Sequence, residues 1–319
     1  MRQYALATVA LAANVLQLIG VYWDVGWHHT FPGVRETFWS RPHMAIYAGV
    51  AVALVAAVLG LFRGDGAGGR TFGSFPGGPY RVAVLGPAMQ IVAAPFDELW
   101  HQVIGQDVSI WSPPHLLGIL GGMVGVLGWI LVLVAPRRDG MPGALRRGLV
   151  FEFAVLLLAG ALFALGEYDH DQAARGPWLY PVLVGLLATW ILVGARTWIG
   201  WAWAGTLVAL GYTVVRSAVA AGVWGMGLPW MGVPPPIVLG ALSLDLFLAR
   251  RGPGVAGALF GIVFTVSDFP VTAILSGRSW TGLEFAGTQV AAAAAGWVSA
   301  VLGQRLLRRM FPRFQDVAP

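Results

Sequence analysis

The sequence contains no cysteine and no lysine among its 319 residues, and it has few charged residues of any kind. Without cysteine, disulfides, thiolate zinc sites and redox dithiols are excluded, so any metal must be held by His, Asp, Glu or backbone oxygen. Charged residues make up 11% of the chain, whereas ordinary soluble domains carry about 25%. This scarcity excludes a soluble domain of useful size.

Apolar residues fill most of the chain instead, at 57%, together with 44 glycines and 15 tryptophans. Glycine lets helix backbones approach closely in lipid, and runs of about 20 apolar residues are long enough to cross a bilayer. The sequence therefore predicts an all-α integral membrane protein, a polytopic bundle of about ten helices. The expected spans lie near residues 4–22, 43–62, 80–96, 115–135, 148–166, 178–195, 198–217, 234–249, 254–275 and 286–306. The first has no small-residue cleavage site, and we expect it to be a retained helix rather than a signal peptide.

The twenty basic residues are all arginine, and they occur in short clusters between the apolar runs. This pattern is typical of membrane topology signals and not of a nucleic-acid surface. With both termini in the cytoplasm, fifteen arginines fall inside and five outside: Arg35, Arg41, Arg175, Arg216 and Arg278. The same topology places all six histidines on the outer side. We therefore expect a protein of a bacterial or archaeal plasma membrane, with its chemistry on the non-cytoplasmic face.

Two outer segments, residues 23–43 and 96–115, repeat the same pattern of Asp-x-x-Trp-His followed by Trp-Ser-x-Pro-His. Equivalent positions are 73 residues apart before a single gap and 72 after it. Each segment joins an outward helix to an inward one, which indicates an internal duplication with copies at about 15–62 and 87–135. We expect residues 1–135 to hold two metal-binding hairpins, and 136–319 to add further helices to a single membrane domain.

The spacing within each copy predicts a metal site. Asp and His four residues apart lie on one face of a helix. Ser40 or Ser112 is a suitable N-cap, and proline is tolerated in the first helical turn, so the distal histidine begins the next helix at a similar depth. Each copy then offers one carboxylate and two imidazoles, which suits copper, zinc or ferrous iron. The predicted ligands are Asp24, His28 and His43 in the first set and Asp97, His101 and His115 in the second.

Other interpretations apply to single positions. Polar residues near helix ends are often caps, and the tryptophans fit an interfacial belt. Haem between His101 and His115 is an alternative, although polar residues and prolines interrupt the segment between them. Outer groups that orient the imidazoles are expected among Glu36, Glu98, Asp107, His29 and His170. An acidic cluster at 167–171, and less so Asp268 and Glu284, could contribute a ligand.

At these residues the chain resembles the C subunit of the copper-containing membrane monooxygenases, which oxidise methane, ammonia and short alkanes. The stretch from Trp100 through Asp107 to Ser112-Pro113-Pro114-His115 is similar to that family's first motif, and Leu85-Gly86-Pro87-Ala88-Met89 is similar to the approach to its second. By order in the chain, the first set would match the family's first copper site. The second set would match the other, with Asp97 in place of an asparagine.

The resemblance covers roughly residues 15–130 and implies copper as the cofactor, with oxygen chemistry on a small apolar substrate. It also implies an assembly of copies or partner subunits in the bilayer. The family's cupredoxin has no counterpart here, and some 200 residues of further helices follow the second motif. A non-catalytic copper or zinc protein for metal handling, assembly or sensing is the alternative. A metal transporter is less favoured, because Glu152 and Asp245 are nearly alone in the inner halves of the helices.

Overall fold

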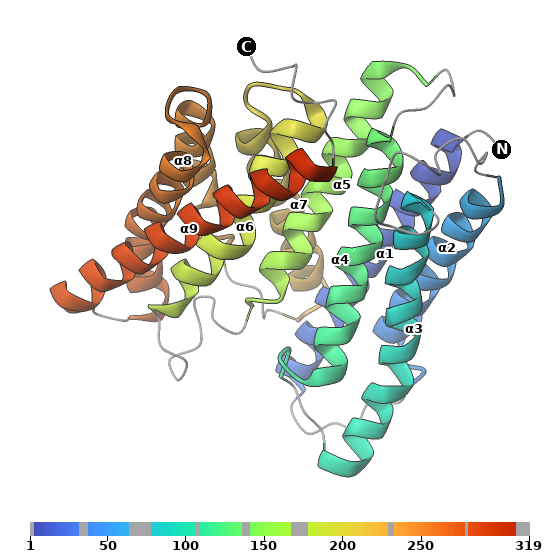
Figure 1. Ribbon diagram of the computed structural model, residues 1–319. Coiled ribbons are helices and arrows are strands. Elements are labelled where there is room, and N and C mark those ends of the chain that lie inside the picture. Colours follow the sequence, from blue (N-terminus) through green and yellow to red (C-terminus); the bar gives the residue numbers. More distant parts are fainter. Residues whose placement is uncertain are drawn as a thin grey trace. The chain divides into compact units, whose positions relative to one another are not determined.

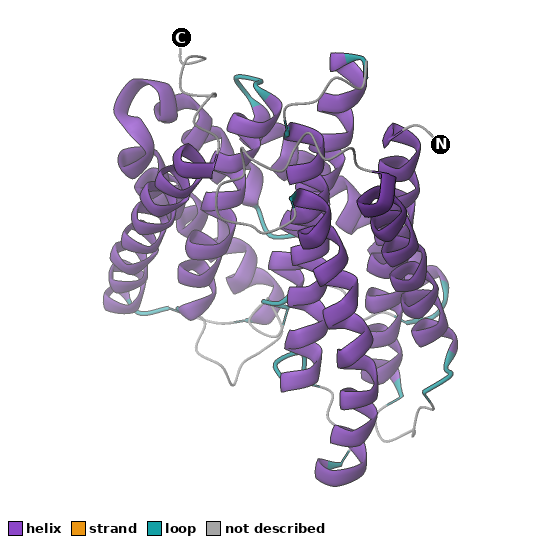
Figure 2. Cartoon of the chain, turned by 45° about the vertical axis from the view of Figure 1, so that its right-hand side comes forward, coloured by secondary structure: helices purple, strands orange, loops and turns teal. Residues whose placement is uncertain are grey.

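The computed structural model describes residues 3–31, 38–63, 78–105, 109–135, 141–166, 178–228, 233–277 and 280–310, and in these ranges it consists of helices and short connecting turns, without a strand (Figures 1 and 2). The helices are long because apolar runs dominate the sequence and helix formation satisfies every backbone group within one segment. Their bounds are α1 Gln3–Thr30, α2 Arg41–Arg63, α3 Pro79–Ile104, α4 Pro113–Val134, α5 Gly143–Phe163, α6 Leu179–Ile199, α7 Ala204–Gly225, α8 Ile237–Ser276 and α9 Gly282–Met310.

Eight of these helices are long and apolar enough to cross a membrane. The ninth, α5, covers residues 148–163 of the expected fifth span but also carries three exposed charged residues, Arg146, Arg147 and Glu152. The prediction of a polytopic helical membrane protein is therefore confirmed. The count of about ten crossings and the sidedness of the termini stay predictions.

Helix α8 is a hairpin of two helices that meet at Gly252, whose φ of 78° and ψ of 173° are not helical. Only glycine adopts this conformation readily, and Pro253 then starts the second half. The halves lie side by side: a Cβ on Gly240 would be 3.0 Å from the Phe260 ring, and Ser267 Oγ donates a hydrogen bond of 3.5 Å to the Pro236 carbonyl. The two apolar runs expected at 234–249 and 254–275 are these two halves.

The chain forms two compact units. The first contains residues 1–160 and 216–231, and in it α1 packs against α2, α2 against α3, and α3 against α4. Helices α1 and α3 run in the same direction, with α2 and α4 returning (Figure 1). The turns from α1 to α2 and from α3 to α4 therefore lie at the same end of this unit.

The two hairpins of the first unit make matching contacts. A Cβ on Gly49 would lie 2.6 Å from the Ala13 carbonyl oxygen and from Gln17 Cγ. At the equivalent position of the second hairpin, a Cβ on Gly121 would lie 2.8 Å from the Gly86 carbonyl oxygen and 2.9 Å from Gln90 Cγ. Glycine is needed at both positions because the facing backbone is too close for any side chain.

In the second unit, residues 161–215 and 232–319, α6 and α8 both pack on α9 through small residues. Gly257 and Gly296 face each other so closely that a Cβ on either would clash with the other's carbonyl. The buried acid Asp245 of α8 accepts two hydrogen bonds of 2.7 Å, from the backbone N–H and the hydroxyl of Thr206. Asp245 thus caps the first turn of α7 from a neighbouring helix.

Two other acids that sequence analysis weighed as weak ligand candidates have local roles. Glu284 forms a capping box with Thr281 at the start of α9: its carboxylate accepts bonds of 2.8 Å from the Thr281 N–H and hydroxyl, and its own N–H donates to that hydroxyl oxygen. Asp268 is buried within α8 and accepts a hydrogen bond of 3.2 Å from Thr272. Neither belongs to a group of potential metal ligands in the described part of the chain.

Candidate metal centres

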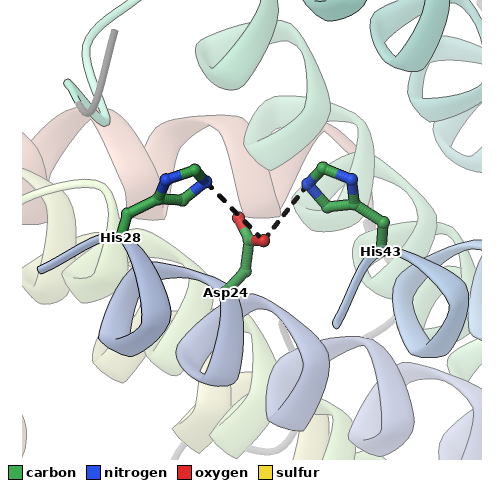
Figure 3. Close-up of side chains that lie close together, drawn as sticks. All are labelled: Asp24, His28 and His43. Atoms are coloured by element: carbon green, nitrogen blue, oxygen red, sulfur yellow. Dashed lines mark ion pairs between the residues drawn. The ribbon is translucent and has the colours of Figure 1, made fainter. Parts of the chain in front are cut away.

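The first ligand set forms where α1 ends and α2 begins. Asp24 and His28 are one turn apart in the last turns of α1, and His43 lies in the first turn of α2. His43 Nε2 is 3.1 Å from Asp24 Oδ1, and His28 Nε2 is 4.0 Å from the same oxygen. Figure 3 shows the carboxylate between the two imidazoles, with one histidine from each helix.

The second set repeats this arrangement at the junction of α3 and α4. His115 Nε2 is 3.1 Å from Asp97 Oδ1, and His101 Nε2 is 3.4 Å from Asp97 Oδ2. The distance from the distal histidine to the carboxylate is thus the same in both sets. Because the carboxylate is within 3.4 Å of both imidazole nitrogens, a haem plane cannot lie between His101 and His115.

The distances within each set fit a shared ion. Two ligand atoms that each lie about 2.1 Å from one metal, at angles of about 90–110°, are separated by about 3.0–3.4 Å. Three of the four His–Asp distances lie in this range, and all three ligand atoms of each set are within 4.8 Å of one another. The six predicted ligands are thus brought together as two groups that could each hold a metal ion. In the described residues these are the only such groups.

The entry into the second helix of each hairpin differs between the copies. Ser40 caps α2 as the sequence predicts, since its Oγ accepts a hydrogen bond of 3.4 Å from the His43 N–H. Ser112 occupies the N-cap position of α4, but its buried hydroxyl makes no hydrogen bond to the described residues. The expected side-chain cap is therefore wrong for Ser112, although the His115 N–H stands where the His43 N–H stands in the first copy.

Backbone carbonyls approach the Nδ1 atoms of both imidazoles of the second set, on the side of each ring away from Asp97. His115 Nδ1 lies 2.7 Å from the Ser109 carbonyl oxygen, and His101 Nδ1 lies 3.4 Å from that of Gly105. A hydrogen bond at Nδ1 fixes the tautomer in which Nε2 is left to bind a metal. Sequence analysis missed these partners because every residue carries a carbonyl, so no residue type marks them.

Of the five acids and histidines expected to orient the imidazoles, Glu98 and His29 lie in the described residues. Glu98 accepts a hydrogen bond of 2.8 Å from Gln102, one turn further along α3. His29 is exposed, and it points about 100° around α1 from His28 because consecutive helical residues are separated by that angle. The other three candidates, Glu36, Asp107 and His170, lie outside the described residues, as does the acidic cluster at 167–171.

The first set is more enclosed than the second. Its three side chains are 15–17% exposed, whereas those of the second set are 19–30% exposed. At Gly26, on the face of α1 opposite Asp24 and His28, an added Cβ would meet Val223 Cγ1 at 3.0 Å and Leu228 Cβ at 3.4 Å. The end of α7 therefore packs against the back of α1 at the height of the first set. This contact could not be foreseen from the sequence, because it joins residues some 200 positions apart.

The two sets occupy equivalent positions in the repeat. Asp24 corresponds to Asp97, and His43 corresponds to His115. Their ligand atoms form two separate groups.

Comparison with family models, curated proteins and solved structures gave no match to this chain. Its function is therefore argued from the two sets and from their surroundings.

Proposed function

We propose that this chain is a membrane protein that binds two copper ions, one in each Asp-His-His set, on the non-cytoplasmic side of the membrane. The observation that supports this most directly is the convergence of one carboxylate and two imidazole Nε2 atoms, twice, within 4.8 Å. The distribution of arginines supports the placement of both sets on the outer side.

Copper is favoured among the three metals that suit these ligands. Two imidazoles and a carboxylate accept copper, zinc or ferrous iron, and for one set of ligands the affinity of divalent metals is highest for Cu²⁺. The resemblance to the copper monooxygenase C subunit at Trp100–His115 supports the same choice. Three protein ligands also leave a coordination position open, as in catalytic metal sites.

We further propose that the sites act in the oxidation of a small apolar substrate, for which bound copper would supply the redox chemistry with O₂. The chain's own contribution is to hold the ion, to fix the imidazoles and to admit an apolar molecule from lipid. Exposed apolar side chains flank both sets and would form this approach: Phe31 and Trp39 beside the first, and Val103, Ile104 and Trp111 beside the second.

A non-catalytic role in metal handling is the second candidate. An oxygenase needs a source of electrons, and no further group of potential metal ligands occurs in the described residues. An external reductant, from a small molecule or a partner subunit, would supply those electrons, whereas a metal-handling protein needs none. Transport is less favoured, because both sets lie at one end of α1–α4 and Asp245 serves as a cap in α8.

Metal content tests the binding proposal. The purified protein is expected to contain about two copper ions per chain after loading, and His28→Ala/His101→Ala is expected to lose most of both, since each set keeps only two ligands. His29→Ala is the matched control, because it removes a neighbouring imidazole that faces away from the set. Full copper content in the double variant, with unchanged helicity, would exclude these residues as ligands.

Turnover separates the two candidate functions. Copper-dependent consumption of O₂ with a short alkane or ammonia, in membranes that contain the native partners and lost in the double variant, supports the oxidation. Stoichiometric copper without such consumption supports metal handling instead.

A further inference from the structure

The two ligand sets are held near each other by a contact between equivalent residues. Gln90 Nε2 donates a hydrogen bond of 2.9 Å to Gln17 Oε1, and these residues are 73 positions apart, the offset of the repeat. Asp24 and Asp97 each follow their glutamine by seven residues, or two helical turns, along helices that run in the same direction. The two sets therefore lie at the same height along these helices, and because side-chain contact holds helix axes about 10 Å apart, the sets are separated by a distance on the order of 10 Å.

The partial burial of both sets strengthens the electrostatic interaction between them. All six ligand side chains are at most 30% exposed, so water screens them less than it screens surface groups. An ion added to one set must therefore change the binding of an ion in the other.

We propose that the two sets form a charge-coupled pair, in which an ion in one set weakens binding in the other by an amount that grows with the charges added. This inference rests on the proposed metal binding. The protein then holds two monovalent ions together more readily than two divalent ions. Full occupancy favours cuprous copper over zinc or other divalent ions, although the ligand types alone accept all of them.

Coulomb's law sets the size of the effect. Two added unit charges about 10 Å apart, at an effective dielectric constant of about 20, weaken the second binding constant on the order of tenfold. The charge added to a set is that of the ion minus that of any protons it displaces. A divalent ion adds one more unit than a monovalent ion at the same pH, so the coupling between two divalent ions is the larger.

The test compares Zn²⁺ with Cu⁺ in the full chain in lipid nanodiscs, with Cu⁺ handled under a reductant and without oxygen. The two stepwise Kd values are measured by competition with a chelator. Two single-set variants, His28→Ala/His43→Ala and His101→Ala/His115→Ala, give the Kd of each set beside an empty neighbour that keeps its carboxylate. The coupling factor is the product of the wild-type Kd values divided by the product of the two single-set values.

We expect a coupling factor of at least about tenfold for Zn²⁺ and a smaller one for Cu⁺, with the Zn²⁺ factor falling as salt is raised. A factor of one for Zn²⁺, or equal factors for both ions, overturns the inference and leaves the proposed binding intact. Failure of both ions to bind the wild type overturns the proposed function and the inference with it. If a single-set variant does not fold, the wild-type ratio of second to first Kd serves instead, and equal ratios for the two ions overturn the coupling.

Discussion

Gln90 and Gln17 pair with each other across the two helical hairpins, with 2.9 Å between the Nε2 of the first and the Oε1 of the second. They occupy the same position in the two copies, and Gln17 is only 5% exposed. The contact gives the buried Gln17 Oε1 a donor, while the Gln17 Nε2 bonds to none of the described residues. The pair therefore fixes α1 against α3 at the same height in both hairpins.

Loss of both amides is expected to cost less stability than the sum of the two single losses. Gln17→Leu leaves the Gln90 amide without its acceptor and is expected to destabilise the protein by about 1–2 kcal/mol. Gln17→Leu/Gln90→Leu removes both polar groups and is expected to lose less than the sum of the single changes. Unfolding in mixed micelles, followed by circular dichroism, gives the double-mutant cycle. Strictly additive losses would show that the pair makes no energetic contribution.

The paired glycines of the hairpins give a second prediction. Gly49→Ala and Gly121→Ala each place a methyl group within 2.8 Å of a carbonyl oxygen of the facing helix, and each is expected to cost about 1–3 kcal/mol by forcing the helices apart. Gly222→Ala in α7 is the control, because a Cβ there meets nothing within 4 Å. It is expected to be neutral or to stabilise by up to about 1 kcal/mol through helix propensity. Equal thermal stability of all three variants would contradict the close packing.

The ligand sets could be predicted from sequence because local geometry decides them. The four-residue spacing of Asp24 and His28 places both on one helix face, and the Ser-x-Pro-His pattern starts the next helix at His43. A repeat of the whole pattern then makes coincidence improbable. The helical membrane architecture follows in the same way from the apolar runs, since their length and composition are properties of single segments.

Contacts between distant segments could not be predicted. The Ser109 carbonyl at His115 carries no residue-specific signal, and the cover of Val223 over Gly26 joins segments far apart in the chain. Asp245 stood out as a lone acid in an apolar run, but its partner Thr206 lies on another helix. A single sequence indicates that such an acid needs a partner without identifying it.

The two serines that begin α2 and α4 give a third prediction, because the same residue has different surroundings in the two copies. Ser40→Ala removes a side-chain acceptor for the His43 N–H and is expected to cost about 0.5–1 kcal/mol. Ser112→Ala removes a buried hydroxyl that bonds to none of the described residues, so it is expected to be neutral or slightly stabilising. The two variants are compared by thermal unfolding of metal-free protein. A larger loss of thermal stability for Ser112→Ala than for Ser40→Ala would show that Ser112, and not Ser40, caps its helix.

Substitutions of Asp245 distinguish a structural role of this carboxylate from a role in metal transport. Asp245→Ala leaves the Thr206 N–H and hydroxyl without their acceptor and is expected to destabilise the protein by about 1–3 kcal/mol, with no loss of bound metal. Asp245→Asn keeps an acceptor oxygen and is expected to cost less, whereas a carboxylate on a transport path could not be replaced in this way. Thr206→Val removes only the hydroxyl bond and is expected to reproduce part of the loss. Stability is followed by unfolding, and metal flux is followed in proteoliposomes loaded with copper. A transport activity that Asp245→Asn abolishes, with stability unchanged, would mean that the carboxylate serves ions rather than the end of α7.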